Sequence, residues 1–111
     1  MNTYQVEIMP DALVEIREQT KFIAADNPRA AEAWLGRLLH SIADLSVFPH
    51  RNPVSKEYTS QVGDEIRQIV FGNYLVIYHI NEVRQVVEVA RFRHASRLPE
   101  SVSEPNLDSD D

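Results

Sequence analysis

Residues 65–97 read EIRQIVFGNYLVIYHINEVRQVVEVARFRHASR, and this stretch decides the fold of the chain. Val, Ile, Phe and Tyr dominate it, and such residues suit a pleated, half-buried surface. Gly72-Asn73 and the polar segment 81–85 each interrupt the apolar run, so the stretch predicts three consecutive antiparallel strands. The last strand carries Arg91, Arg93, His94 and Arg97 close to its end. Burying such charge costs free energy, so we expect this end to be exposed and to form the functional surface.

The residues before this stretch predict a short strand and then a helix. Residues 4–8, YQVEI, alternate apolar and polar side chains and stop at Pro10, as a strand does. Asp11 is the expected helix cap, and one apolar stripe extends from there to about Ala25. The stripe consists of Leu13, Ile16, Thr20 and Ile23.

A second helix follows and forms a hairpin with the first. Asn27-Pro28 breaks the first pattern, because proline disfavours helical geometry in the preceding residue and is at home in a first turn. Phe48-Pro49 closes the second helix, and segment 49–64, rich in proline and polar residues, reads as a surface loop. The apolar face of the second helix consists of Ala31, Trp34, Leu35, Leu38, Leu39, Ile42 and Leu45. The hairpin is the only cover available for the sheet, so we expect an α+β fold of order β-α-α-β-β-β, with the hairpin on a small antiparallel sheet.

Composition limits the classes of function. The 111 residues fit one compact domain, which we place at 1–99, and they include no cysteine, which excludes disulfides and thiolate chemistry. Residues 1–11, MNTYQVEIMPD, lack the basic start and apolar run expected of a secretory signal, and no stretch approaches the roughly 18 consecutive apolar residues of a membrane span. We therefore expect a cytoplasmic protein without a membrane partner. His40, His50 and His79 are dispersed, so neither a metal site nor another cofactor is expected.

The charge is unevenly distributed. The net charge is −6, but residues 100–111, ESVSEPNLDSDD, hold five acidic and no basic residues. Residues 1–99 are therefore close to neutral, and the last predicted strand within them is locally basic. The tail lacks aromatic residues and periodicity, so it is predicted to be disordered. An alternative is that it folds back over the basic strand end and mimics phosphate.

A family resemblance rests on the helical hairpin, Phe48-Pro49, the segment IRQIVFGNYLVIYHI and the ending VVEVARFRHASR. In these features, residues 2 to about 98 resemble the ParE/RelE superfamily of type II toxins. The resemblance implies a growth-inhibiting toxin that is neutralised by a cognate antitoxin and serves plasmid stabilization. A homodimer or a hetero-oligomer with the antitoxin is the assembly expected. An alternative to an active toxin is a degenerate toxin fold that is kept as a binding module.

The superfamily has two functional branches. RelE-like members cleave messenger RNA in the ribosome without a metal, which requires an acid, a base and positive charge on the phosphate. The candidates for such an endoribonuclease are Arg67, His94 and Arg97. The set is incomplete, because RelE-like enzymes typically have arginine where Leu75 follows Tyr74. They also often have an aromatic hydroxyl near the C-terminus, which this chain lacks. The residues therefore favour the ParE-like branch, whose members bind DNA gyrase, over a ribosome and messenger RNA target.

Target or antitoxin binding is assigned to Arg91, Arg93 and Arg97, together with Trp34 on the hairpin. Trp34 also fits the core, as do Tyr74 and Tyr78 on one face of a strand. Alternation along the last strand places Arg91, Arg93 and Ala95 on one side of the sheet. Phe92 should then be buried under the helices, with His94 at their rim.

Overall fold

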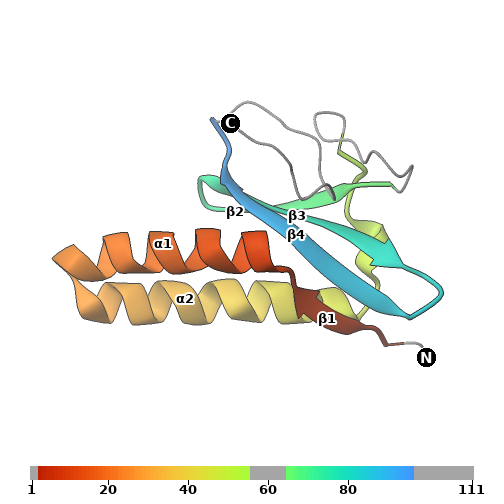
Figure 1. Ribbon diagram of the computed structural model, residues 1–111, viewed down its shortest axis with the longest axis horizontal. Helices are drawn as coiled ribbons and strands as arrows, with labels where there is room; N and C mark the ends of the chain where they lie inside the picture. The colour runs from red at the N-terminus through yellow and green to blue at the C-terminus, as the bar shows by residue number, and fades with distance from the viewer. Residues whose placement is uncertain (1–2, 56–64, 97–111) are drawn as a thin grey trace.

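The helical hairpin packs against one face of a four-stranded sheet in the computed structural model, which describes residues 3–55 and 65–96 (Figure 1). The elements are β1 (Gln5–Ile8), α1 (Pro10–Asp26), α2 (Pro28–Ala43), two 3-10 turns (Asp44–Ser46 and Pro49–Arg51), β2 (Arg67–Phe71), β3 (Tyr74–Asn81) and β4 (Val86–His94). The predicted order of elements and the α+β fold class are confirmed. No helix within the described ranges is long and apolar enough to cross a membrane.

α1 begins two residues earlier than predicted. Its cap is Met9, whose side chain makes no capping hydrogen bond, and Pro10 occupies the first turn. The prediction that Asp11 caps the helix is therefore wrong. Proline favours the start because its fixed φ already suits a helix, and Asp11 then lies in the first turn, where a negative charge interacts favourably with the helix dipole.

α2 begins as predicted, but its outer surface differs from the prediction. The side chain of Asn27 accepts a hydrogen bond of 3.0 Å from the amide of Ala30 and caps the helix. Leu39, expected on the apolar face, is 43% exposed. It follows Leu38 directly, and a helix turns by about 100° per residue, so the two neighbours cannot both point into the core.

Three of the strands form the predicted antiparallel meander, and β1 extends it. The strand order is β1-β4-β3-β2, with β2, β3 and β4 antiparallel to one another. β1 lies parallel to β4, with Gln5 opposite Val86 and Ile8 opposite Val89, so the sheet as a whole is mixed. Gly72, in the turn from β2 to β3, has a φ of 59°, which glycine adopts without steric cost.

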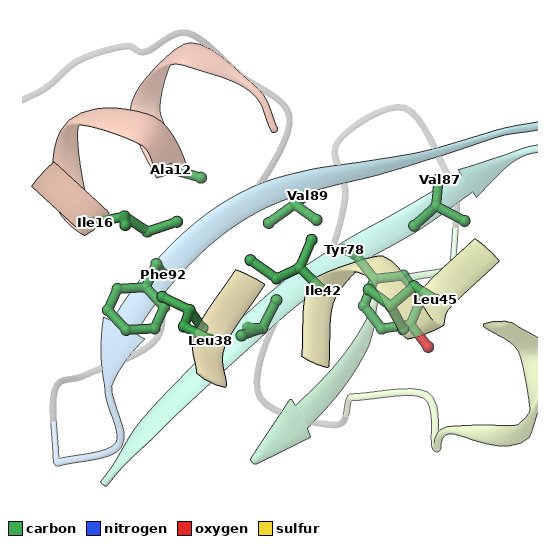
Figure 2. Close-up of a cluster of buried hydrophobic side chains, with 10 residues drawn as sticks. Ala12, Ile16, Leu38, Ile42, Leu45, Tyr78, Val87, Val89 and Phe92 are labelled. Carbon is green, nitrogen blue, oxygen red and sulfur yellow. The ribbon is translucent and has the colours of Figure 1, made fainter. Parts of the chain in front are cut away.

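The main core lies between the hairpin and the sheet (Figure 2). Figure 2 shows Ala12, Ile16, Leu38, Ile42 and Leu45 facing Tyr78, Val87, Val89 and Phe92. Trp34 contacts Phe71, Tyr74 and Phe92 edge to face, at ring distances of 5.8 to 6.1 Å. The sequence-based placement of Trp34, Tyr74 and Tyr78 in or against the core is thus confirmed.

The other face of the sheet is also partly buried. A smaller cluster of Ile66, Ile77 and Ala90, with Leu75 against it, lies outside the main core. Ala90 is the extra residue of a β-bulge, because Tyr78 pairs with Val89 whereas Ile77 pairs with Arg91. A bulge bends its strand and re-aims the side chains that follow. The basic end of β4 begins directly after this irregularity.

Candidate functional site

A groove of about 890 Å³ lies between α1 and the end of β4. Its lining includes Val14, Glu18 and Phe22 from α1, and Arg91, Arg93 and His94 from β4. Val14 and Phe22 are 54% and 73% exposed, which is high for apolar side chains. The groove therefore combines exposed apolar surface with the charged residues that the sequence places at this end of the sheet.

Arg91 is bound to α1 rather than exposed on the sheet. Its Nε lies 3.2 Å from both carboxylate oxygens of Glu15, and its Nη2 donates to Oε2 of Glu15 at 2.6 Å. Oε1 of Glu15 also accepts the backbone amide of Phe92 at 2.8 Å. Both side chains of the ion pair are largely buried, at 20% exposed for Arg91 and 24% for Glu15. Glu15 thus neutralises one of the arginines predicted to form an exposed basic surface.

Arg93 is buried, so the expectation that the strand end is exposed does not hold for it. Only 8% of the residue is exposed, and it lies opposite Leu75 on β3. Phe92, its neighbour along the strand, is buried under the helices as predicted. Arg97 lies outside the described residues.

His94 lies half-buried at the rim, where it was predicted. It is paired with Tyr74 across the strands, and the two rings meet edge to face at 5.2 Å. Its Nδ1 accepts the backbone amide of Ser96 at 3.2 Å and is 2.7 Å from the Ser96 hydroxyl. A nitrogen that accepts an amide proton carries none itself, so the neutral ring bears its proton on Nε2.

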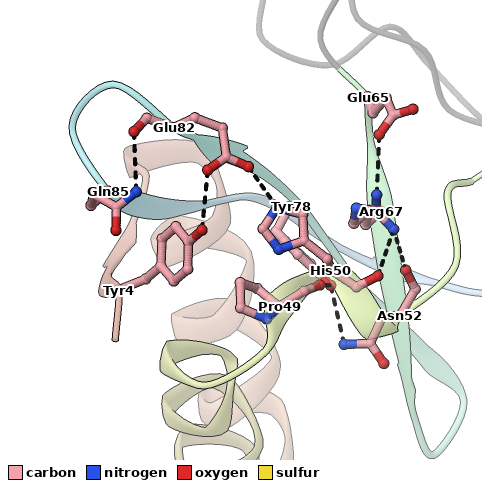
Figure 3. A network of polar contacts seen from close by, with 9 residues as sticks. All are labelled: Tyr4, Pro49, His50, Asn52, Glu65, Arg67, Tyr78, Glu82 and Gln85. Atoms are coloured by element: carbon pink, nitrogen blue, oxygen red, sulfur yellow. Dashed lines mark hydrogen bonds and ion pairs between the residues drawn. The ribbon is translucent and has the colours of Figure 1, made fainter. Parts of the chain in front are cut away.

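Arg67 lies at the start of the edge strand β2 and holds a loop (Figure 3). Its Nη1 donates to the carbonyl oxygens of His50 at 3.0 Å and Asn52 at 2.6 Å, and its Nη2 pairs with Glu65 at 3.1 Å. Tyr78 fastens the same loop, since its hydroxyl donates to the carbonyl of Pro49 at 2.6 Å. Burial raises the pKa of Tyr78.

Arg67 and His94 are not brought together. Arg67 pairs with Tyr78 and His94 with Tyr74, so four residues of β3 separate their positions along the sheet. At about 3.3 Å per residue this corresponds to ~13 Å. The two candidate nuclease residues therefore do not converge on one phosphate.

A second polar cluster, which the sequence did not reveal, joins the start of β1 to the turn between β3 and β4 (Figure 3). Glu82 accepts the hydroxyl of Tyr4 at 3.1 Å and lies 2.5 Å from Nε2 of His50. The hydrogen bond from His50 lowers the pKa of Glu82, and partial burial together with Glu82 raises the pKa of Tyr4. These contacts fasten three segments that are far apart in the sequence.

The fold is shared with chains of solved toxin-antitoxin complexes. A chain of the toxin-antitoxin complex RelBE2 from Mycobacterium tuberculosis matches with a TM-score of 0.55 and 20% identity, over 83% of this chain and 98% of that chain. A chain of the archaeal RelE-RelB complex from Pyrococcus horikoshii OT3 matches with a TM-score of 0.58 and 22% identity, over 86% and 98%.

The family described as the ParE toxin of the type II toxin-antitoxin system, parDE, matches residues 6–99. The chain belongs to this family and is a toxin of the ParE/RelE superfamily, as its sequence motifs predicted. Among curated proteins, none matches the sequence at a significant level.

Proposed function

We propose that this toxin acts by binding DNA gyrase and that a cognate antitoxin neutralises it. The observation that carries the proposal against a nuclease is the separation of Arg67 from His94 along β3. Cleavage of RNA at a 2′-hydroxyl needs a base, an acid and positive charge around one phosphate. Here the Arg67 guanidinium bonds two backbone carbonyls and Glu65, and Arg67 pairs with β3 four positions away from the residue that pairs with His94.

The charge available at the end of β4 also supports binding over catalysis. Glu15 neutralises Arg91, and Arg93 is buried beside Leu75. Removing one electrostatic donor from an active site typically costs ~10²–10³ in rate. A site in which Arg91 is neutralised and Arg93 is buried retains little of that stabilisation.

The groove between α1 and β4 is the surface that we assign to the macromolecular partner. Its exposed apolar residues, Val14 and Phe22, resemble the apolar centre of a protein interface more than a pocket for a single nucleotide. Membership of the toxin family supports an antitoxin as one partner, in a hetero-oligomer. The proposed target places the protein in the cytoplasm.

Two assays on the same purified protein test the proposal. We expect inhibition of gyrase supercoiling and intact messenger RNA on translating ribosomes. Cuts in codon register at substoichiometric protein, with supercoiling unaffected, would replace gyrase binding by the ribonuclease activity. Normal growth of cells that contain abundant folded protein without its antitoxin would instead favour a degenerate binding module.

A further inference from the structure

β1 covers only the first half of β4. The parallel pairing ends where Ile8 lies opposite Val89, and the amide of Met9 makes the last hydrogen bond, to the carbonyl of Val89 at 2.9 Å. The chain then turns into α1 at Pro10. The second half of β4 therefore faces a helix along this edge, and a helix offers no strand backbone to continue the hydrogen-bond ladder.

The side chain of Glu15 takes the place of the missing strand. Its Oε1 accepts the amide of Phe92 at 2.8 Å, three residues beyond the last bond to β1. Buried backbone amides are nearly always paired, and Phe92 is only 3% exposed. A neutral acceptor at the position of Oε1 would still satisfy this amide, although through a weaker hydrogen bond.

The same carboxylate holds Arg91 side-on. Both of its oxygens lie within 3.2 Å of Nε, and Nη2 donates to Oε2 at 2.6 Å. Charge-assisted bidentate pairs of this kind are roughly twice as strong as neutral hydrogen bonds and define the orientation of the guanidinium. For this contact, unlike the one to Phe92, the negative charge is essential.

We propose that Glu15 is the positioning residue of the toxin's binding surface: by fixing the Arg91 guanidinium against α1, it sets the orientation of the guanidinium that lines the groove facing the target. Arg91 and His94 line the same groove, so a change in the orientation of Arg91 alters the surface that a partner meets. The inference rests on the proposed function, because it assigns target binding to this groove.

Glu15→Gln separates the two tasks of the carboxylate. The amide oxygen still accepts the proton of Phe92, whereas the neutral side chain no longer orients Arg91. We expect hydrogen exchange of the Phe92 amide to stay within about tenfold of the wild-type rate, because that hydrogen bond is kept although its acceptor loses its charge. We expect growth inhibition, at matched protein levels, to need about tenfold more toxin, the factor that separates a charged from a neutral hydrogen bond. Glu32→Gln, the same chemical change on the exposed face of α2, is the matched control and should retain wild-type potency.

Two results would overturn the inference. Wild-type potency of Glu15→Gln would mean that the carboxylate only closes the strand edge. Lost potency together with Phe92 exchange that is at least about tenfold faster would mean that the loss comes from local opening of the strand.

If the wild-type protein does not inhibit growth, the proposed function fails. The positioning claim is then decided by the NMR signal of the Arg91 Nε proton. A signal that is protected from exchange in the wild type and in Glu32→Gln, but not in Glu15→Gln, supports it. A signal that is protected in all three proteins refutes it.

Discussion

Arg67→Ala distinguishes a structural arginine from a catalytic one. The Arg67 side chain is 15% exposed and donates to the carbonyl oxygens of His50 and Asn52, at 3.0 and 2.6 Å. Hydrogen bonds to charged groups contribute about 1.5–3 kcal/mol each, and one of these two is solvent-exposed, so their joint loss should cost about 3 kcal/mol. The ion pair to Glu65, which is 69% exposed, adds less than about 1 kcal/mol.

The assay is thermal and urea unfolding together with potency per folded molecule. For a domain near 100 residues, about 3 kcal/mol lowers Tm by roughly 15 °C. Arg84→Ala is the matched control, because Arg84 is 54% exposed and makes longer ion pairs of 3.3 Å to Glu7 and Glu88. We expect it to cost less than about 1 kcal/mol. An Arg67→Ala protein of unchanged stability that has lost its potency would refute the structural role and restore Arg67 as a functional residue.

Two further variants test other parts of the structure. Asn27→Ala removes the side chain that accepts the Ala30 amide at the start of α2, and should lower the free energy of unfolding by about 1 kcal/mol in urea melts; an unchanged melt would show that the cap is dispensable. Glu82 has a folded-state pKa below its ordinary value, mainly because of the hydrogen bond from His50. Its contribution to stability is therefore complete above the unfolded-state pKa and is lost as the pH falls through the folded-state pKa. Glu82→Gln should accordingly reduce the difference in the free energy of unfolding between neutral and acidic pH, as measured by urea melts at both pH values. A loss of stability at acidic pH as large as that of the wild type would contradict this role.

Local sequence determined the elements and most of the core. Asn27-Pro28 and Gly72-Asn73 mark a helix start and a turn through backbone restrictions that act within a few residues. Periods of two and of three to four residues show which face of each element is apolar, which is why the burial of Phe92 and the inward position of Trp34 were predictable. Such signals need no knowledge of the neighbouring element.

The candidate site depended on contacts between distant segments. Glu15 and Arg91 are 76 positions apart, and nothing near Glu15 distinguishes it from an ordinary exposed helix acid. Similarly, the bulge at Ala90 and the burial of Arg93 arise where β4 meets β3. The sequence thus determined that four basic residues lie close together from Arg91 to Arg97, whereas the tertiary structure decided the environment of those that it describes, Arg91, Arg93 and His94. The physical reason is that the energy of a charged side chain depends on the partners and the solvent around it, and only the packing of α1 and β3 against β4 sets these for the described part of the strand end.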